Sequence, residues 1–327
     1  MAESDPVLAI EGLSVDFRTR AGRLHALRNV SLDVPKGEIV GIVGESGCGK
    51  STLINAVLGL LAANGEVTAG SIRFDGEDLV GMPEERIRAL RGERISVVFQ
   101  DPMTALNPVF SIGTQMLNIQ YRSGRSRAEK LARATAMLAK VKIPDPERRL
   151  SQYPHQFSGG MRQRISIAMA LMQEPDLLIA DEPTTALDAT LEVQVIHLIR
   201  ELQRDIGCAV LFISHHLGVI AELCDSVVVM YAGEVAERGS VRDIFHDPRH
   251  PYAAKLIECD PARIKERTRR LPTVPGEIPN LVRLPEGCIF TPRCYRAFER
   301  CAAERPAERH VAGRHRAACH LALEPAP

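Results

Sequence analysis

The stretch IVGIVGESGCGKS, residues 39–51, decides the fold. Residues 39–43 are apolar on both faces, which is typical of a central parallel strand. Residues 44–51 match the pattern G-x-x-x-x-G-K-[ST], and residues 53–61 carry apolar side chains at helical spacing. A Gly-rich loop between a strand and a helix is the context that confirms a phosphate-binding P-loop.

The residue types of this loop suit a bound triphosphate. Glycines let backbone N–H groups wrap the phosphates, and the start of the helix adds the positive end of a dipole. Lys50 is expected to reach the β- and γ-phosphates, and the Ser51 hydroxyl to bind Mg²⁺. Cys48 is expected to be only a small residue of the loop. The residues expected to contact ATP are Gly44, Ser46, Gly47, Cys48, Gly49, Lys50, Ser51 and Thr52.

A second acidic motif follows another buried strand. Residues 177–182 read LLIADE, an apolar run that ends in two carboxylates. Asp181 at the end of the strand can hold Mg²⁺, and Glu182 can polarise an attacking water. Such a run is weak by itself, because strands often end in solvated acids. Downstream of a P-loop it indicates nucleotide hydrolysis.

Composition narrows the class of protein. At about 150 residues per domain, 327 residues suggest two domains, or one large domain with an extension. The 41 basic and 41 acidic residues cancel, so no strong pull toward nucleic acid or anionic lipid is expected. The 45% hydrophobic content excludes disorder, and no apolar run reaches the roughly 18 residues that span a bilayer. The start MAESDP does not resemble a secretory signal, which predicts a cytosolic protein with reduced thiols.

Hydrophobic periodicity predicts alternating strands and helices as far as residue 245. Strands are expected over residues 8–17, 30–34, 39–43, 177–180, 208–213 and 227–230. Helices are expected over residues 126–141, 159–172 and 191–206, the last one ended by Gly207. Beyond residue 245 the chain is rich in Pro, Arg and Cys, so a domain boundary is placed there.

Further motifs resemble those of ABC ATPases. FSGGM at residues 157–161 resembles the signature motif, usually LSGGQ; Gln100 resembles the Q-loop glutamine, TALD at 185–188 the D-loop, and His215 the switch histidine. Their order and spacing match the family from about residue 8 to residue 243. The resemblance implies an α/β fold: a P-loop NTPase with a RecA-like core, an antiparallel β subdomain and an α-helical subdomain. It places this nucleotide-binding domain at residues 1–244, with the helical subdomain at about 101–165.

The resemblance also implies roles for single residues. Ser158, Gly159 and Gly160 would contact the γ-phosphate of ATP held by a second ATPase subunit. Phe17 would stack on adenine, the alternative being an ordinary core position in a strand. Gln100 would sense Mg²⁺ and the attacking water, and Asp188 would communicate across the dimer. The implied catalytic residues are Glu182, His215, Lys50 and Gln100, and the implied magnesium ligands are Ser51, Gln100 and Asp181.

Three residues depart from the family pattern. The signature begins with Phe157 and ends in Met161, but neither change removes the serine or the glycine amides, so phosphate contact should survive. His216 follows the switch histidine where the family more often has Asp, which puts the fine control of the D-loop in doubt. Because Glu182 and His215 are both present, a hydrolysis-competent site is expected.

Three other stretches resemble oligopeptide/dipeptide permease ATPases, most closely the dipeptide "D" type. They are QDPMTALNP at 100–108, YPHQ at 153–156 and HPY at 250–252, the alternative being generic surface packing. The resemblance implies import of di- or oligopeptides, although similar ATPases move nickel, sugars and opines. It further implies a second, different ABC ATPase subunit, two membrane-spanning permease subunits and a substrate-binding protein. The chain would sit peripherally on the cytoplasmic face of the inner membrane, with no nucleic-acid partner.

Four cysteines crowd the tail. Cys288, Cys294, Cys301 and Cys319 follow the spacing C-x5-C-x6-C-x17-C, which lacks the C-x2-C pair of a common zinc ribbon. Four thiolates in a short, core-poor tail could hold a metal centre that adds stability. The resemblance implies a [4Fe–4S] cluster in an extension covering residues 245–327; zinc and no metal remain the alternatives.

Three other functions fit the sequence less well. A non-transport ABC ATPase acting on DNA would separate the Q-loop from the signature by a long coiled coil. Here 57 residues, 101–157, intervene without a heptad run. A translation ABC protein would carry two ATPase domains, whereas this chain has one P-loop. A purely regulatory module would not need Glu182 and His215, and the basic run at 263–270 is interpreted as solvated tail.

Overall fold

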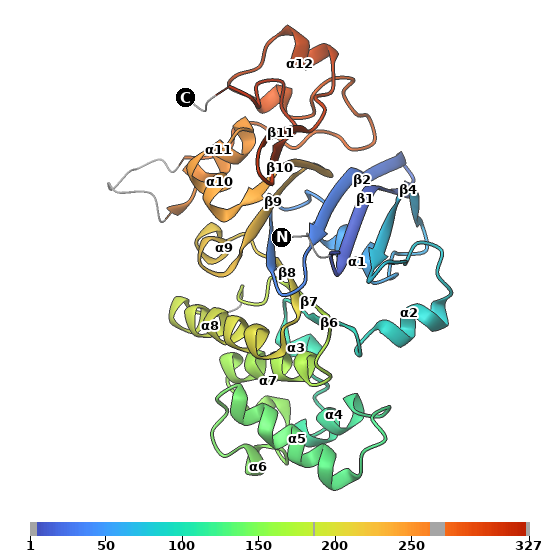
Figure 1. Ribbon diagram of the computed structural model, residues 1–327, viewed down its shortest axis with the longest axis vertical. Helices are drawn as coiled ribbons and strands as arrows, with labels where there is room; N and C mark the ends of the chain where they lie inside the picture. Colours follow the sequence, from blue (N-terminus) through green and yellow to red (C-terminus); the bar gives the residue numbers. More distant parts are fainter. Residues whose placement is uncertain (1–4, 186, 262–271, 325–327) are drawn as a thin grey trace. The chain divides into compact units, whose positions relative to one another are not determined.

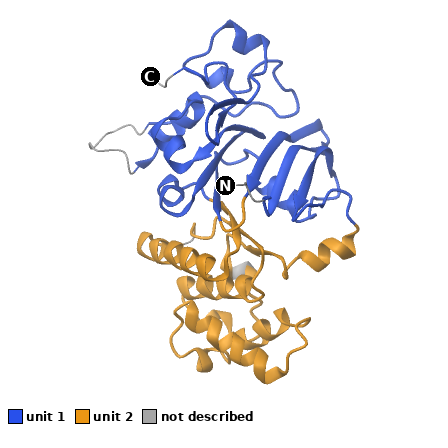
Figure 2. Cartoon of the chain, viewed as in Figure 1, with its two compact units in different colours: residues 1–34, 38–82, 214–327 blue, residues 35–37, 83–213 orange. Residues whose placement is uncertain are grey.

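The computed structural model describes residues 5–185, 187–261 and 272–324 (Figure 1). The basic run 263–270 and Ala186 of the 185–188 motif lie outside these residues. The chain forms two compact units (Figure 2). Unit 1 comprises residues 1–34, 38–82 and 214–327, and unit 2 comprises residues 35–37 and 83–213. Each unit is described by itself.

Unit 1 contains two sheets and the C-terminal part of the chain. Its elements are β1 (Leu8–Thr19), β2 (Gly22–Val34), β3 (Ile39–Val43), α1 (Lys50–Val57), β4 (Gly65–Phe74), β5 (Glu77–Asp78), α9 (Leu217–Leu223), β9 (Ser226–Tyr231), β10 (Glu234–Ser240), α10 (Val241–His246), α11 (Pro251–Glu258), a 3-10 turn (Thr291–Arg293), α12 (Glu299–Ala303), β11 (Arg309–Ala312) and β12 (His315–Ala317).

The first sheet of unit 1 is antiparallel, in the order β2-β1-β4-β5. Leu8, Ile10, Leu13 and Val15 of β1 are fully buried, as the alternating pattern predicted. β2 begins earlier than the predicted strand 30–34, because a tight turn pairs Gly22 directly with Thr19. The polar residues that open β2 had concealed this part of the strand.

The second sheet contributes the order β11-β12-β10-β9-β3 to unit 1. All five residues of β3 are buried, and β3 pairs in parallel with β9. These contacts confirm the prediction that residues 39–43 form a central parallel strand. The strand therefore holds the start of the phosphate loop rigidly at its carboxyl end.

The tail extends this sheet, which the sequence analysis did not anticipate. β12 pairs antiparallel with β10, placing Ala317 opposite Glu237, and β11 pairs with β12. The Glu237 carboxylate is fully buried and accepts hydrogen bonds from Arg249 N (2.7 Å), His250 N (2.8 Å) and His315 Nε2 (2.7 Å). Strands of three and four residues are too short to display a period of two.

An aromatic cluster packs the tail against the rest of unit 1. The ring of Phe290 lies 5.0 Å from that of Tyr231 and 5.4 Å from that of Tyr252, and all three side chains are buried. Edge-to-face pairs of this kind add about 0.5–1.5 kcal/mol beyond the burial of their area. The expectation of a core-poor tail is therefore wrong for this segment.

Unit 2 combines three parallel strands with helices. Its elements are α2 (Glu84–Leu90), β6 (Ile95–Val98), α3 (Pro102–Ala105), α4 (Ile112–Ile119), α5 (Arg127–Lys140), α6 (Pro146–Arg149), a 3-10 turn (Pro154–Gln156), α7 (Gly159–Leu171), β7 (Leu177–Asp181), α8 (Ala189–Ile206) and β8 (Ala209–Ile213). The strand order is β8-β7-β6, all parallel.

Local signals fix the helices of unit 2. Ser126 and Glu129 form a capping box at the start of α5, and α8 ends at Gly207, whose φ of 75° is left-handed. α4, α5, α6 and α7 lie together (Figure 1). The predicted helices at 126–141, 159–172 and 191–206 are thus confirmed within one or two residues.

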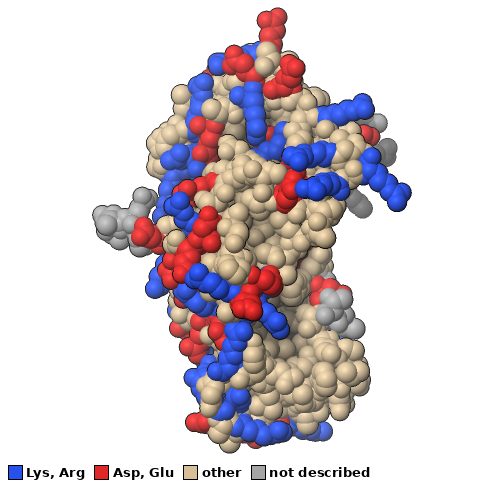
Figure 3. Space-filling model, turned by 90° about the vertical axis from the view of Figure 1, so that its right-hand side faces the viewer, with Lys and Arg blue, Asp and Glu red and all other residues tan. Residues whose placement is uncertain are grey.

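Charges of both signs lie among one another on the face shown in Figure 3. Many of the ion pairs that the structure contains join side chains exposed to solvent, such as Arg94 with Asp176. Pairs of this kind contribute little to stability. Among the described residues, no helix combines the length and apolar character needed to cross a membrane.

Candidate functional site

The phosphate loop connects β3 to α1, and two of its glycines have no substitute. Gly44 has a φ of 155°, and a Cβ atom there would lie 2.2 Å from the Met230 carbonyl oxygen. Gly49 has a φ of 108°, and its Cβ would lie 2.7 Å from the Leu27 side chain. Only glycine allows the backbone to pass so close to its neighbours.

Lys50 is buried and turned back into this loop. Its Nζ donates hydrogen bonds to the carbonyl oxygens of Gly44 (2.7 Å) and Glu45 (3.3 Å). The loop thus encloses a fixed positive charge, which is the feature that a triphosphate requires. Ser46, Gly47 and Ser51 are exposed at the same loop, and Thr52 is half-buried.

Cys48 is almost completely buried within the loop. Burial raises the pKa of the Cys48 thiol, although the neighbouring Lys50 acts in the opposite direction. A protonated, enclosed thiol is a poor nucleophile. These properties support the interpretation of Cys48 as a small loop residue.

Unit 1 also carries Phe17 and His215. Phe17, near the end of β1, is half-buried, and its ring lies so close to Gly65 that a Cβ there would be 2.6 Å from it. The Phe17 ring thus packs directly against the backbone at the start of β4. His215 is exposed, and its ring meets that of His216 edge-on with 4.3 Å between centroids.

In unit 2 the acidic motif and the Q-loop residue meet. Gln100 Nε2 donates to Glu182 Oε2 at 3.2 Å, and Thr185 Oγ1 donates to the same oxygen at 3.1 Å. Asp181 is the last residue of β7 and is half-buried. The contact of Thr185 with Glu182 was not predicted from the sequence, although Thr185 lies only three residues further on.

The backbone of Glu182 is unusual. Its φ is +46°, a left-handed conformation that is rare for residues other than glycine, and its N–H donates to Ile213 O at 3.0 Å. Such a conformation costs on the order of 1–3 kcal/mol and concentrates at functional sites. The surrounding structure therefore holds this carboxylate in a defined direction.

The signature residues stand at the start of α7. Ser158 is its N-cap and accepts a hydrogen bond from Met161 N at 3.4 Å, while Gly159 is exposed and has open space around it. A Cβ on Gly160 would lie 2.9 Å from Leu191 of α8. Phe157 is buried beneath the Arg149 guanidinium, so the departure at this position serves packing.

Asp188 is the N-cap of α8. Its Oδ1 accepts hydrogen bonds from Thr190 N and Leu191 N, both at 3.0 Å. The described structure thus gathers Gln100, Asp181, Glu182, Ser158 and Asp188 in unit 2, and the phosphate loop, Phe17 and His215 in unit 1.

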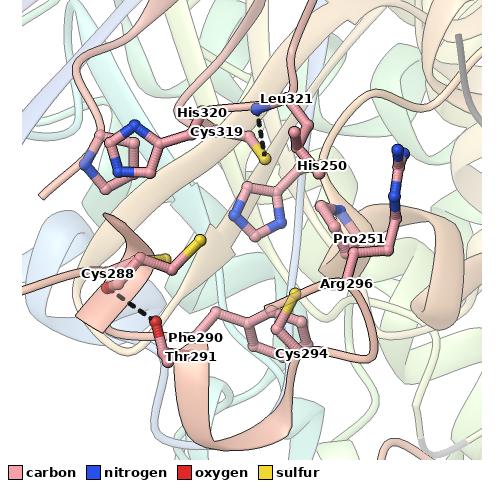
Figure 4. A pocket seen from close by; sticks show the side chains of 12 residues that line it. His250, Pro251, Cys288, Phe290, Thr291, Cys294, Arg296, Cys319, His320 and Leu321 are labelled. Carbon is pink, nitrogen blue, oxygen red and sulfur yellow. Dashed lines mark hydrogen bonds between the residues drawn. The ribbon is translucent and has the colours of Figure 1, made fainter. Parts of the chain in front are cut away.

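The four tail cysteines line one pocket of unit 1, together with His250, Phe290 and other residues (Figure 4). Thr291 Oγ1 donates to Cys301 O at 3.0 Å, and Leu321 N donates to Cys319 Sγ at 3.4 Å. Burial raises the pKa of Cys288 and Cys294, and that of Cys319 to about 11. The thiols of Cys288, Cys294 and Cys319 are therefore protonated at neutral pH unless a cation stabilises the thiolates.

Across the part of the chain that the structure describes, no group of three or more His, Cys, Asp or Glu residues is arranged to hold a metal ion. The expected iron–sulfur cluster and its zinc alternative thus receive no support from this arrangement.

Two family models match the chain. The one described as "ABC transporter" matches residues 27–185, and the one described as "Oligopeptide/dipeptide transporter, C-terminal region" matches residues 236–301. The first range contains the phosphate loop and the signature. The second contains three of the four tail cysteines.

Several proteins are similar over nearly their whole length. The "Oligopeptide transport ATP-binding protein OppD" of Escherichia coli (strain K12) is 46% identical over 316 residues, covering 96% of this chain and 93% of that protein. The "Probable D,D-dipeptide transport ATP-binding protein DdpD" of the same organism is 48% identical over 300 residues, covering 91% of each.

Solved structures resemble the cassette part of the chain. The dimeric structure of a post-hydrolysis state of the ATP-binding cassette MJ0796, bound to ADP and Pi, has a TM-score of 0.64 and 28% identity. It covers 72% of this chain and 99% of its own. The cbiO1 structure from Clostridium perfringens, part of the transporter complex cbiONQ, also has a TM-score of 0.64 and covers 74% of this chain and 91% of its own.

These comparisons confirm the P-loop ABC ATPase fold and the resemblance stated from the motifs. The alternative of a DNA-repair or translation ATPase is not favoured, because the near-full-length relatives are transport subunits. The chain belongs to the ABC transporter ATPases, within the oligopeptide/dipeptide transporter family.

Proposed function

We propose that this chain binds and hydrolyses ATP to power the import of di- or oligopeptides by a multi-subunit ABC importer. The observation that carries the proposal is the phosphate loop between β3 and α1, with Lys50 enclosed by its carbonyl oxygens. The similarity to oligopeptide and dipeptide transport proteins over more than 90% of the chain supports the substrate class.

ATP binding is assigned to the loop and to Phe17. Backbone N–H groups of residues 44–52, except that of Glu45, would wrap the phosphates. Lys50 would leave its loop carbonyl oxygens to bind phosphate oxygens, and Phe17 would stack on adenine. Ser51, Gln100 and Asp181 offer the oxygen ligands that Mg²⁺ prefers. When bound, Mg²⁺ supplies charge neutralisation at the β- and γ-phosphates.

Hydrolysis is assigned to the Glu182 side chain. Its carboxylate would orient the attacking water and accept a proton from it, while Gln100 and Thr185 fix one of its oxygens. His215 would donate a hydrogen bond to the γ-phosphate. The fixed, left-handed backbone at Glu182 supports this role.

The signature is assigned to a neighbouring nucleotide. The exposed N-terminus of α7, with Ser158, Gly159 and Gly160, would bind the γ-phosphate of ATP held by a second, different ABC ATPase subunit. Asp188 would relay the state of one site to the other. Two membrane-spanning permease subunits and a substrate-binding protein would complete the importer. The chain would then lie peripherally on the cytoplasmic face of the inner membrane.

The tail cysteines are assigned to a [4Fe–4S] cluster in the extension 245–327, which follows the nucleotide-binding domain 1–244. Cys288, Cys294, Cys301 and Cys319 line one pocket. A cluster distributes its four thiolate ligands over four irons, so the sulfurs need not surround one ion as zinc requires. Iron and acid-labile sulfide should be measured on anaerobically purified protein. Stoichiometric zinc, or no metal, would contradict the assignment.

Transport in proteoliposomes tests the function. We expect the complete importer to accumulate a radiolabelled tripeptide when ATP is supplied, and Lys50→Met in this chain to abolish uptake because the phosphates lose their fixed positive charge. Lys142→Met, which removes an exposed pairing with Glu201, is the control that keeps uptake. Accumulation of nickel or a sugar in place of peptides would overturn the substrate class.

A further inference from the structure

One side chain from the C-terminal part of the chain, that of Arg293, holds the phosphate loop. Arg293 lies between Cys288 and Cys294 in sequence, and its guanidinium forms a bidentate ion pair with Glu45, the second residue of the loop. Nη1 donates to Glu45 Oε2 at 2.7 Å, and Nη2 donates to Oε1 at 3.0 Å. Two parallel bonds fix the direction of the carboxylate as well as its distance.

The guanidinium is itself immobilised. Its side chain is 3% exposed, Nε donates to Pro275 O at 2.7 Å, and Nη2 also donates to Val274 O at 3.1 Å. Nη1 lies 3.3 Å from the Tyr231 hydroxyl, and the group stands over the Tyr231 ring at 5.6 Å from its centroid. The Arg293 guanidinium is thus buried, and all three of its nitrogens donate hydrogen bonds.

A second contact holds the backbone of the same residue. The Glu45 N–H donates to the Tyr252 hydroxyl at 3.0 Å, and Tyr252 is fully buried beside Tyr231 and Phe290. Both the main chain and the side chain of Glu45 are therefore held by residues far along the chain.

The charges of Glu45, Arg293 and a bound triphosphate explain what these contacts do. Glu45 carries a negative charge in a loop whose ligand, on the proposed function, is a highly negative triphosphate. Arg293 cancels that charge, and both of its Nη groups are occupied by Glu45, so it cannot bind the phosphates itself. An unpaired carboxylate left beside the loop would repel the ligand, because partly buried charges are poorly screened.

We propose that Arg293 is a positioning residue for ATP: it neutralises and orients Glu45. The segment from Cys288 to Cys319 thereby sets the affinity of the phosphate loop for ATP. The inference rests on the proposed function of this loop. It does not depend on whether the cysteines hold a metal.

Steady-state kinetics of the complete importer with Mg–ATP test the inference. Arg293→Met should raise KM for ATP at least tenfold and change kcat less than threefold, because the chemistry at Glu182 is untouched. Glu45→Gln should raise KM less than Arg293→Met does, since the charge that it leaves unpaired is the positive one of Arg293, which does not repel a triphosphate. Glu45→Gln added to Arg293→Met should bring KM down at least threefold from the Arg293→Met value.

The matched control is Arg314→Met. Arg314 also joins the tail to the start of β3, pairing with Glu38 at 2.9 Å, but it is exposed and lies outside the loop. The KM for ATP of the Arg314→Met importer should stay within twofold of the KM of the unaltered importer. If the unaltered importer and this control fail to hydrolyse ATP, the proposed function fails rather than the inference.

Two results would overturn the inference. One is an Arg293→Met KM within twofold of the unaltered value with only a lower melting temperature, which indicates a purely structural anchor. The other is a double variant whose KM equals or exceeds that of Arg293→Met. If Arg293→Met does not fold, Arg293→Gln with and without Glu45→Gln provides the same comparison. Arg293→Lys, which keeps the positive charge but not the two parallel bonds, should give a KM between those of the unaltered importer and the neutral variant.

Discussion

Single residues of this protein are held by contacts that fit the roles proposed for them. Glu182 has a left-handed backbone, and one of its oxygens accepts hydrogen bonds from Gln100 and Thr185. A carboxylate fixed in this way loses little entropy on reaching the transition state.

Replacing Glu182 by Gln should separate binding from hydrolysis. The amide keeps the size of the side chain but cannot accept a proton, so kcat should fall by about 10²- to 10⁴-fold while ATP still binds. Phosphate release and nucleotide retention measured on the same importer give both quantities. Glu174→Gln, at an exposed pair with Arg133, is the control. A kcat reduced less than tenfold would contradict the assignment.

At the scale of elements, the start of α8 depends on one side chain. Asp188 accepts hydrogen bonds from two backbone N–H groups that have no other partner within the helix. Asp188→Ala should lower the free energy of unfolding by about 1 kcal/mol, whereas Asp188→Asn should lower it by much less. Urea denaturation distinguishes the two. Equal losses in both variants would show that the charge, not the cap, is what matters.

The N-cap of α11 is the buried His250, and protonation of its ring would destabilise the fold. Burial lowers the pKa of His250 to about 4, and its Nδ1 accepts a hydrogen bond from Tyr252 N at 3.0 Å. Below pH 6.5 the unfolded chain takes up a proton that the folded chain refuses. Stability is therefore lost as the pH falls from about 6.5 to about 4, by up to roughly 3 kcal/mol.

Melting curves at several pH values test this linkage. His250→Asn keeps a capping acceptor and removes the titrating ring, so its melting temperature should depend less steeply on pH between 6.5 and 4.5. His246→Asn, at an exposed position, should retain the original slope. Parallel curves for all three proteins would show that His250 does not govern acid stability.

At the scale of the whole molecule, residues 245–261 and 272–324 pack against the rest of unit 1. β12 pairs with β10, Phe290 packs on Tyr231, and Glu237 accepts hydrogen bonds from the tail. Removing residues 245–327 should expose this core, cost several kcal/mol and lower the melting temperature by about 10 °C or more. An unchanged melting temperature for residues 1–244 would contradict the coupling.

Local pattern explains which parts of this molecule could be predicted. The strand at 39–43, the loop with Lys50 and the helix end at Gly207 follow from short-range periodicity and glycine geometry. The pairing of Arg293 with Glu45 joins residues 248 apart and leaves no local trace. The strands at 309–312 and 315–317 are likewise too short to show a pattern. Tertiary contacts alone reveal how the tail reaches the phosphate loop.

The most direct measurement is a structure of the assembled importer carrying Glu182→Gln, determined with Mg–ATP. We expect one triphosphate enclosed between the loop at 44–52 and the signature of the second ATPase subunit, with Ser158 of this chain on that subunit's nucleotide. A nucleotide absent from the loop, or Ser158 far from every bound phosphate, would contradict the account.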